Sequence, residues 1–176
     1  PHRLLGPSDT RHLYLLNGYV DSTKLKNKLA FDLFRAFGNA ERPRFAPEID
    51  WTEVFVNGEY LGIYETCTRI DADMLGSGND PADQTVVYKV RADQTLFADA
   101  HARGIEQVSP PLSRQRRMEP AKELMAFTSQ ADPETFAAKI SDWIDLGNAV
   151  DFFLLLNFAG NEDGRTTNFS LARRGT

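Results

Sequence analysis

The sequence predicts a protein of the α+β class, with strands concentrated in its middle and helices mainly later. Two observations support this class. Aromatic and β-branched residues flank a tight-turn dipeptide at Asn57 and Gly58, and a long apolar run from Ala149 to Ala159 follows two helix-start signals. A parallel α/β sheet would instead show strands and helices in regular alternation.

The first elements are a short strand and an amphipathic helix. Leu13 to Leu16 is apolar and leads into turn-forming residues, which is typical of a strand end. The helix is expected to start at Asp21 or Ser22 as its cap and to end before Gly38 as its C-terminal glycine. Its apolar residues recur at every fourth position, as the helical period requires. They are Leu25, Leu29, Leu33 and Phe37.

A β-hairpin is predicted next. Its strands are Trp51 to Val56 and Tyr60 to Thr66, and Asn57-Gly58 between them readily adopts the positive φ angles of a two-residue turn. Gly62, inside the second strand, fits either a bulge or a simple packing position.

The central part of the chain predicts one further strand between two irregular segments. Residues 76–84 are rich in Gly, Asp and Pro and are predicted to form a loop. Val86 to Val90 is the strand, and its Lys89 suits an exposed strand position or, alternatively, a position facing phosphate. Arg91 to Met118 is long, polar and proline-bearing, which predicts an irregular insertion over the surface.

Three helices are predicted near the end of the chain. One starts near Pro120, and the next is capped by Asp132 with Pro133 in its first turn. Asp145 then caps the helix that contains the apolar run. Because this helix is apolar nearly all round, we expect it to be buried centrally.

Composition narrows the classes of function. The 176 residues, 41% of them hydrophobic, fit one domain, and the net charge of -5 argues against a nucleic-acid partner. Cys67 is the only cysteine, which excludes an internal disulfide. No apolar run reaches the length of a membrane span. The chain does not begin with Met and ends after a strand, so we expect a segment of a longer protein.

Asp163 and Asn168 stand at the two ends of a polar loop between the apolar helix and the strand predicted to begin at Asn168. Protein kinases use an aspartate that accepts the substrate hydroxyl proton and an asparagine five residues later that holds magnesium. The segment D-G-R-T-T-N has this spacing. Since Asp, Gly and Asn are also common turn residues, these six residues alone favour a structural turn.

Three blocks together resemble the CotH family, the spore-coat atypical protein kinases and their relatives. They span Leu16 to Phe34, Val54 to Tyr64 and Asn161 to Phe169, in family order. The resemblance implies a divergent protein-kinase-like fold, ATP and Mg²⁺ as cofactors, and transfer of the γ-phosphate to Ser or Thr of a protein partner. It also implies that Asp163 is the catalytic base and Asn168 a metal ligand.

The nucleotide contacts follow the family pattern less closely. Where the family places a glutamate before a basic residue, this chain has Thr68, and its nearest acid is Glu65. Glu65 and Lys89 are therefore the candidate cofactor-binding residues. The family's phosphate-pairing lysine strand and its second metal carboxylate are expected outside these residues. We thus expect residues 1–176 to be one CotH kinase-like domain, incomplete at both ends and inactive alone.

Two alternatives remain. The first is a non-catalytic module of the same fold that binds or adheres at a cell surface or spore coat, since a fold can be retained after its activity is lost. The second is a plain structural domain. The sequence itself does not identify a compartment, and only the resemblance suggests a cell-surface, secreted or spore-coat location.

Overall fold

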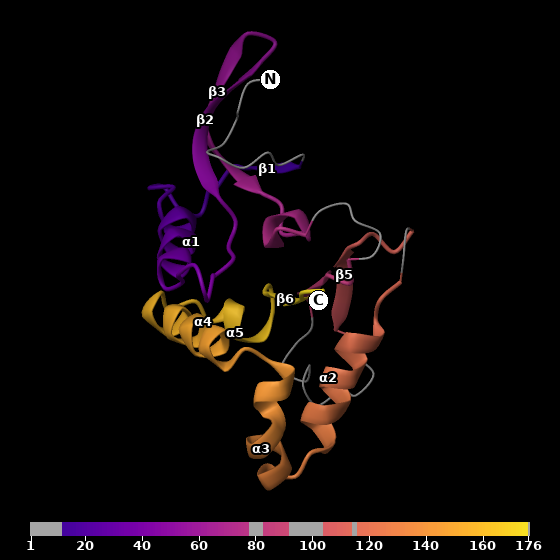
Figure 1. Ribbon diagram of the computed structural model, residues 1–176. Coiled ribbons are helices and arrows are strands. Elements are labelled where there is room, and N and C mark those ends of the chain that lie inside the picture. Colours follow the sequence, from indigo (N-terminus) through magenta and orange to yellow (C-terminus); the bar gives the residue numbers. More distant parts are fainter. Residues whose placement is uncertain (1–11, 78–82, 92–103, 114–115, 176) are drawn as a thin grey trace. The chain divides into compact units, whose positions relative to one another are not determined.

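The computed structural model describes residues 12–77, 83–91, 104–113 and 116–175. The chain divides into two compact units, Pro1–Ile70 (unit 1) and Asp71–Thr176 (unit 2). Each unit combines helical segments with one three-stranded antiparallel sheet (Figure 1), which confirms the predicted α+β class. The expectation of a single domain stays a prediction.

In its described residues, unit 1 contains a three-stranded sheet and one helix. Its elements are β1 (Leu13–Leu16), α1 (Lys26–Ala36), β2 (Ile49–Val56) and β3 (Glu59–Thr68). The strand order is β1-β3-β2, and both pairings are antiparallel. The predicted strand at Leu13–Leu16 and the predicted hairpin are therefore both confirmed.

The hairpin turn has the backbone that its two residues favour. Asn57 and Gly58 have φ angles of 52° and 86°, as a two-residue turn with two positive φ angles requires. Val54 pairs with Gly62 whereas Phe55 pairs with Tyr60, so the register shifts by one residue at this point. Gly62 has a φ of 119° and lies at this irregularity, which confirms the bulge alternative.

The helix of unit 1 starts later than predicted. α1 begins at Lys26, and the Asp21 carboxylate accepts the N–H groups of Thr23, Leu25 and Lys26, so Asp21 organises the turn before the helix. Gly38 does not have a positive φ. It is needed for space, because a Cβ there would lie 2.6 Å from the Arg44 backbone nitrogen.

Helix α1 and the turn before it pack on one face of the sheet through polar contacts. The Trp51 indole N–H donates to the Lys24 carbonyl at 2.9 Å, and the Lys28 ammonium donates to the Ile49 carbonyl at 3.1 Å. Ile49 and Trp51 are two residues apart on β2, so their side chains lie on the same face of the sheet. The opposite face carries Thr66.

Unit 2 contains the second sheet and most of the helices. Its order is η1 (Asp73–Leu75), β4 (Val86–Val90), β5 (Ile105–Ser109), α2 (Glu119–Gln130), α3 (Pro133–Trp143), α4 (Leu146–Phe158), α5 (Asp163–Thr166) and β6 (Ser170–Arg173). The sheet order is β5-β4-β6. The core lies against the central strand β4. Its buried members are Val86, Tyr88, Val90, Ile105, Ala121 and Met125.

Strand β5 corrects the prediction of an irregular insertion from Arg91 to Met118, of which residues 92–103 and 114–115 lie outside the described part. Ile105 and Gln107 point inward on β5, and a polar residue at an inward position conceals the expected alternation. The Gln107 amide is satisfied there. It donates to the Pro110 carbonyl at 2.6 Å and accepts the Arg117 N–H at 2.7 Å. The predicted loop at 76–84 also lies partly outside the described residues, at 78–82.

The three predicted late helices are present. The Asp132 carboxylate accepts the N–H groups of Glu134 and Thr135 at the start of α3, and Asp145 accepts that of Asn148 at the start of α4. Both aspartates therefore cap their helices as predicted.

Helix α4 is not buried centrally as predicted. Leu155 and Leu156 are buried, but the Phe158 side chain is 82% exposed, and Phe153 and Leu154 are also exposed. Burial needs neighbours on every side as well as an apolar sequence. In the described chain, α5 packs against α4, and the Phe152 ring lies 6.0 Å from that of Phe169. The remaining apolar surface of α4 stays open.

Candidate functional site

The segment from Asp163 to Asn168 is held by its own backbone and by a neighbouring asparagine. Helix α4 ends at Phe158, and Gly160 reverses the chain with a φ of 60°. The Asn161 N–H donates to the Leu156 carbonyl at 3.0 Å, and the Asn161 side chain accepts the Gly164 N–H at 3.0 Å. The predicted loop is thus tightened into the one-turn helix α5, which begins at Asp163.

Gly164 allows this turn to approach α4 closely. It is buried, and a Cβ at its position would lie 2.6 Å from the Leu156 Cδ2 and 3.2 Å from the Asn161 Nδ2. A larger residue would therefore push α5 away from α4. The Asp163 side chain, one residue earlier, is exposed. Gly164 thereby fixes the backbone next to an accessible carboxylate.

Asn168 is fixed by the edge of the unit 2 sheet. Its backbone is in the left-handed region with a φ of 59°, which asparagine tolerates better than most residues. Its N–H donates to the Val90 carbonyl at 3.0 Å, and the Val90 N–H donates to the Phe169 carbonyl at 2.9 Å. The Asn168 side chain is exposed. The sheet therefore holds the backbone and leaves the carboxamide accessible.

Lys89 lies on the strand that holds Asn168. In the register of the sheet it pairs with Ser170 of β6 on one side and with Glu106 of β5 on the other. Its side chain is half-buried. The structure thus places Lys89 next to Val90, the residue whose carbonyl accepts the Asn168 N–H. Lys89, Asp163 and Asn168 all belong to unit 2.

Glu65 belongs to unit 1 and is only 1% exposed. It is on the central strand β3, between Leu16 of β1 and Trp51 of β2. The Asn27 side-chain amide donates to its carboxylate at 2.9 Å, which joins α1 to the sheet. The contact in the structure is therefore internal to unit 1. Its predicted role in cofactor binding is untested.

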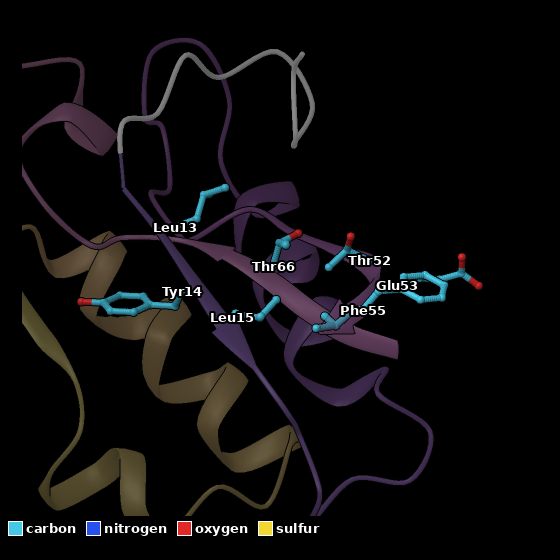
Figure 2. Close-up of a pocket in the computed structure, with 8 residues that line it drawn as sticks. Leu13, Tyr14, Leu15, Thr52, Glu53, Phe55 and Thr66 are labelled. Carbon is cyan, nitrogen blue, oxygen red and sulfur yellow. The ribbon is translucent and has the colours of Figure 1, made fainter. Parts of the chain in front are cut away.

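Oxygen atoms of Asp163 and Asn168 are the donors that magnesium prefers, and both side chains are exposed. Over the described ranges, no three His, Cys, Asp or Glu side chains gather closely enough to hold a metal ion. These two residues fit part of a magnesium site. A hollow over the sheet of unit 1 is lined by none of the four predicted residues (Figure 2).

Sequence reasoning missed three residues that position the candidates. Asn161 and Gly164 shape the turn at Asp163, and Asn27 holds Glu65. Asn161 and Gly164 lie within the third block and Asn27 within the first, so the blocks contained them without indicating their roles.

Comparison with known proteins identifies the family. The sequence model of the family described as "CotH kinase protein" matches residues 2–176. The chain belongs to the CotH family. This confirms the resemblance seen in the three sequence blocks, and the α+β architecture is consistent with it.

One curated relative is the "Inner spore coat protein H" of Bacillus subtilis (strain 168). It is 22% identical over 171 residues, which cover 94% of this chain and 46% of the relative. The CotH chain described here thus spans about half the length of that protein. None of the helices in the described part is long and apolar enough to cross a membrane.

Proposed function

We propose that the chain is part of a Mg²⁺-dependent protein kinase with a divergent kinase-like fold, which transfers the γ-phosphate of ATP to a Ser or Thr hydroxyl of a protein. The observation that carries the proposal is the short segment between α4 and β6. It has an exposed carboxylate at Asp163 and an exposed carboxamide at Asn168, both on a firmly held backbone, in a chain of the CotH family.

In this mechanism, Asp163 accepts the proton of the attacking hydroxyl, and the Asn168 side-chain oxygen contributes to binding Mg²⁺. The metal ion neutralises charge on the phosphates when bound. Phosphoryl transfer depends mostly on positioning. The hydrogen bonds of Asn161 and Val90 therefore matter, because they fix the backbone at both ends of the segment. Lys89 is proposed to face the phosphates, and Glu65 to support the nucleotide-binding part from within unit 1.

The test is phosphate transfer from labelled ATP by the full-length protein. Asp163→Asn removes the base with little change in volume and should lower kcat by about 10²- to 10⁴-fold. Glu162→Gln is the matched control, since Glu162 is an exposed acid in the same segment. Asn168→Gly keeps the positive φ and removes the carboxamide, so it should raise the Mg²⁺ concentration needed for half-maximal rate.

Unchanged transfer in Asp163→Asn would exclude the assigned role of this residue. A full-length protein that folds but transfers no phosphate would favour the second candidate, a non-catalytic binding module of the spore coat or cell surface. The name of the Bacillus relative and the exposed aromatic residues of the hairpin favour that candidate.

A further inference from the structure

Arg165 is a cation held close to Asp163 by a neutral side chain of helix α4. Its Nη2 donates to the Asn157 Oδ1 at 2.7 Å, and the Asn157 Nδ2 donates to the Phe153 carbonyl at 2.7 Å. Asn157 lies in the last turn of α4, and Arg165 lies in α5, which packs against α4 (Figure 1). Because the second hydrogen bond orients the carboxamide, the two bonds together fix the guanidinium at the end of α4.

The positive charge of Arg165 is not neutralised in this arrangement. Glu162 stands three residues earlier, at a spacing that allows an ion pair on a helix. Over the described residues, however, neither Glu162 nor Asp163 accepts a hydrogen bond from the Arg165 side chain. A guanidinium has several N–H donors, and Asn157 accepts from one of them. The remaining donors, on an exposed side chain that is already oriented, suit an anionic group of a ligand.

The two ends of the segment have different neighbours. Asn168, the proposed metal ligand, is held against Val90 at the edge of the sheet, and Lys89, the proposed phosphate contact, precedes Val90 on β4. Arg165 is tied to α4 instead. The sheet end of the segment therefore holds the candidate phosphate contacts, whereas the helix end holds a separate cation.

The surface of α4 that leads to Asn157 suits a polypeptide better than a nucleotide. Leu146, Val150 and Phe153 precede Asn157 at helical spacing, so all four residues lie on one face of the helix. The three apolar side chains are 44%, 54% and 59% exposed. Phosphate groups gain nothing from contact with such a surface, whereas apolar side chains of a protein do.

We propose that Arg165 is a specificity-determining residue that binds an acidic side chain of the protein substrate, next to the Ser or Thr hydroxyl that Asp163 deprotonates. Asn157 is the positioning residue that holds the guanidinium for this contact. The preferred substrate therefore has an aspartate or glutamate close to its acceptor hydroxyl. This inference rests on the proposed phosphoryl transfer, because it describes the substrate of that same site.

The test measures phosphate transfer from labelled ATP by the full-length protein to three nine-residue peptides. Each peptide has one serine and otherwise leucines, except that the residues on both sides of the serine are aspartate, asparagine or lysine. We expect kcat/KM to be about fivefold higher for the aspartate peptide than for the asparagine peptide, as one exposed ion pair allows. The lysine peptide should be the poorest substrate, and the preference for aspartate should weaken as salt rises.

Substitutions of Arg165 change the charge that selects the peptide. Arg165→Met keeps the length of the side chain and removes its charge, so the preference for the aspartate peptide over the asparagine peptide should disappear. Arg165→Glu should reverse the selection and make the lysine peptide the best of the three. Lys139→Met is the matched control, because Lys139 is an exposed cation on α3 of the same unit, and it should keep the preference for aspartate.

Substitutions of Asn157 separate the hold on the guanidinium from its charge. Asn157→Asp keeps an oxygen that accepts from Arg165 but neutralises the guanidinium, so the preference for aspartate should disappear as in Arg165→Met. Asn157→Leu leaves the charge and removes the acceptor, so the preference should be reduced but still present. A preference that Asn157→Asp retains in full would contradict selection by the charge of Arg165.

The failure of this inference can be distinguished from the failure of the proposed function. Transfer without preference for the aspartate peptide would overturn the inference and leave the proposed function intact. Equal losses with the aspartate and asparagine peptides in Arg165→Met would also overturn it, because the guanidinium would then act on a group common to both reactions, such as the transferred phosphate.

If the full-length protein transfers no phosphate, the proposed function fails, and peptide binding decides the inference separately. Fluorescence anisotropy of the labelled aspartate peptide measures this binding. Binding that weakens in Arg165→Met and not in Lys139→Met would support recognition of an acidic protein segment. No binding, or binding that Arg165→Met leaves unchanged, would overturn it.

Discussion

The two sheets of the molecule are built by different kinds of contact. In unit 1, β2 and β3 are joined by the two-residue turn at Asn57 and Gly58, so their pairing is local. In unit 2, the central strand β4 pairs with β5 and β6, which are both distant in sequence. The β2–β3 pair can form from its own hairpin signal, whereas the pairing of β1 with β3 and both pairings of the unit 2 sheet require the chain to return from a distance.

The side chains of the two sheets also differ in how far they are exposed to solvent. Strand β4 is almost wholly buried and packs with Met125 of α2, which has no exposed surface. The hairpin instead exposes large apolar side chains. They are Phe55, Tyr60, Leu61 and Ile63. The unit 2 sheet therefore serves as a scaffold that holds Asn168, whereas the unit 1 sheet presents a surface. We therefore expect function at the edge of the unit 2 sheet and on the exposed surface of the unit 1 sheet.

The largest expected difference between the units is in stability. Met125→Ala should lower the free energy of unfolding of unit 2 by about 2 to 5 kcal/mol, because it leaves a cavity in the core. Leu61→Ala should cost unit 1 less than about 1 kcal/mol, since this side chain is 49% exposed. The two tryptophans, Trp51 in unit 1 and Trp143 in unit 2, allow each unit to be followed separately.

Urea unfolding would be monitored by fluorescence in Trp51→Phe and Trp143→Phe backgrounds. If Met125→Ala shifted the Trp51 and Trp143 transitions equally, the units would unfold together, and the contrast between them would not extend to stability.

The sequence predicts local features well and long-range features poorly. The hairpin turn, the caps at Asp132 and Asp145, and the strand at Val86–Val90 each follow from a few adjacent residues. Strand β5 was missed because its inward Gln107 is satisfied by residues outside the strand, and local periodicity cannot reveal such partners. The burial of α4 was overestimated because burial depends on which elements pack around it.

The same limit applies to the candidate site. The spacing of Asp163 and Asn168 could be read directly, because both lie in one segment. The contribution of Val90 could not, since it depends on the pairing of β4 with the chain that enters β6. Glu65 shows the reverse case. The family resemblance indicated it as a cofactor-binding candidate, which stays a prediction, but its burial beside Asn27 could not be read from the sequence because it depends on how α1 meets the sheet.

Two glycines, one in each unit, are required for different physical reasons. Gly58 is needed for its φ of 86° and has open space around it, whereas Gly164 is needed for space near Leu156. Alanine should destabilise at both positions, by about 1 to 2 kcal/mol at Gly58 and about 1 to 3 kcal/mol at Gly164.

Asparagine separates these two causes. Gly58→Asn should recover most of the stability lost in Gly58→Ala, because asparagine tolerates a positive φ. Gly164→Asn should be worse than Gly164→Ala, because it adds volume where none is free. Thermal unfolding of the four variants measures these changes in stability. Equal behaviour of asparagine at both sites would contradict the assigned causes.

The smallest expected effect concerns the aspartates that start a helical turn in each unit. The hydroxyl of Thr23 and the backbone N–H of Lys26 lower the pKa of Asp21 from 3.8 to about 2. The pKa of Asp132 is also lowered, but its main cause is the backbone N–H of Thr135, with the Thr135 hydroxyl second. Each carboxylate stabilises the folded state above its unfolded pKa, near 4, and this contribution is lost as the pH falls through the folded pKa.

Replacing the hydroxyl distinguishes the two cases. Thr23→Val should raise the pKa of Asp21 clearly towards 3.8, because it removes the largest cause. Thr135→Val should raise that of Asp132 less, because the backbone N–H, which donates at 2.9 Å, remains. Carboxyl ¹³C NMR titration measures both values. A larger rise in pKa at Asp132 than at Asp21 would contradict this assignment. It would mean that the Thr135 hydroxyl, and not the backbone N–H, is the main cause of the lowered pKa of Asp132.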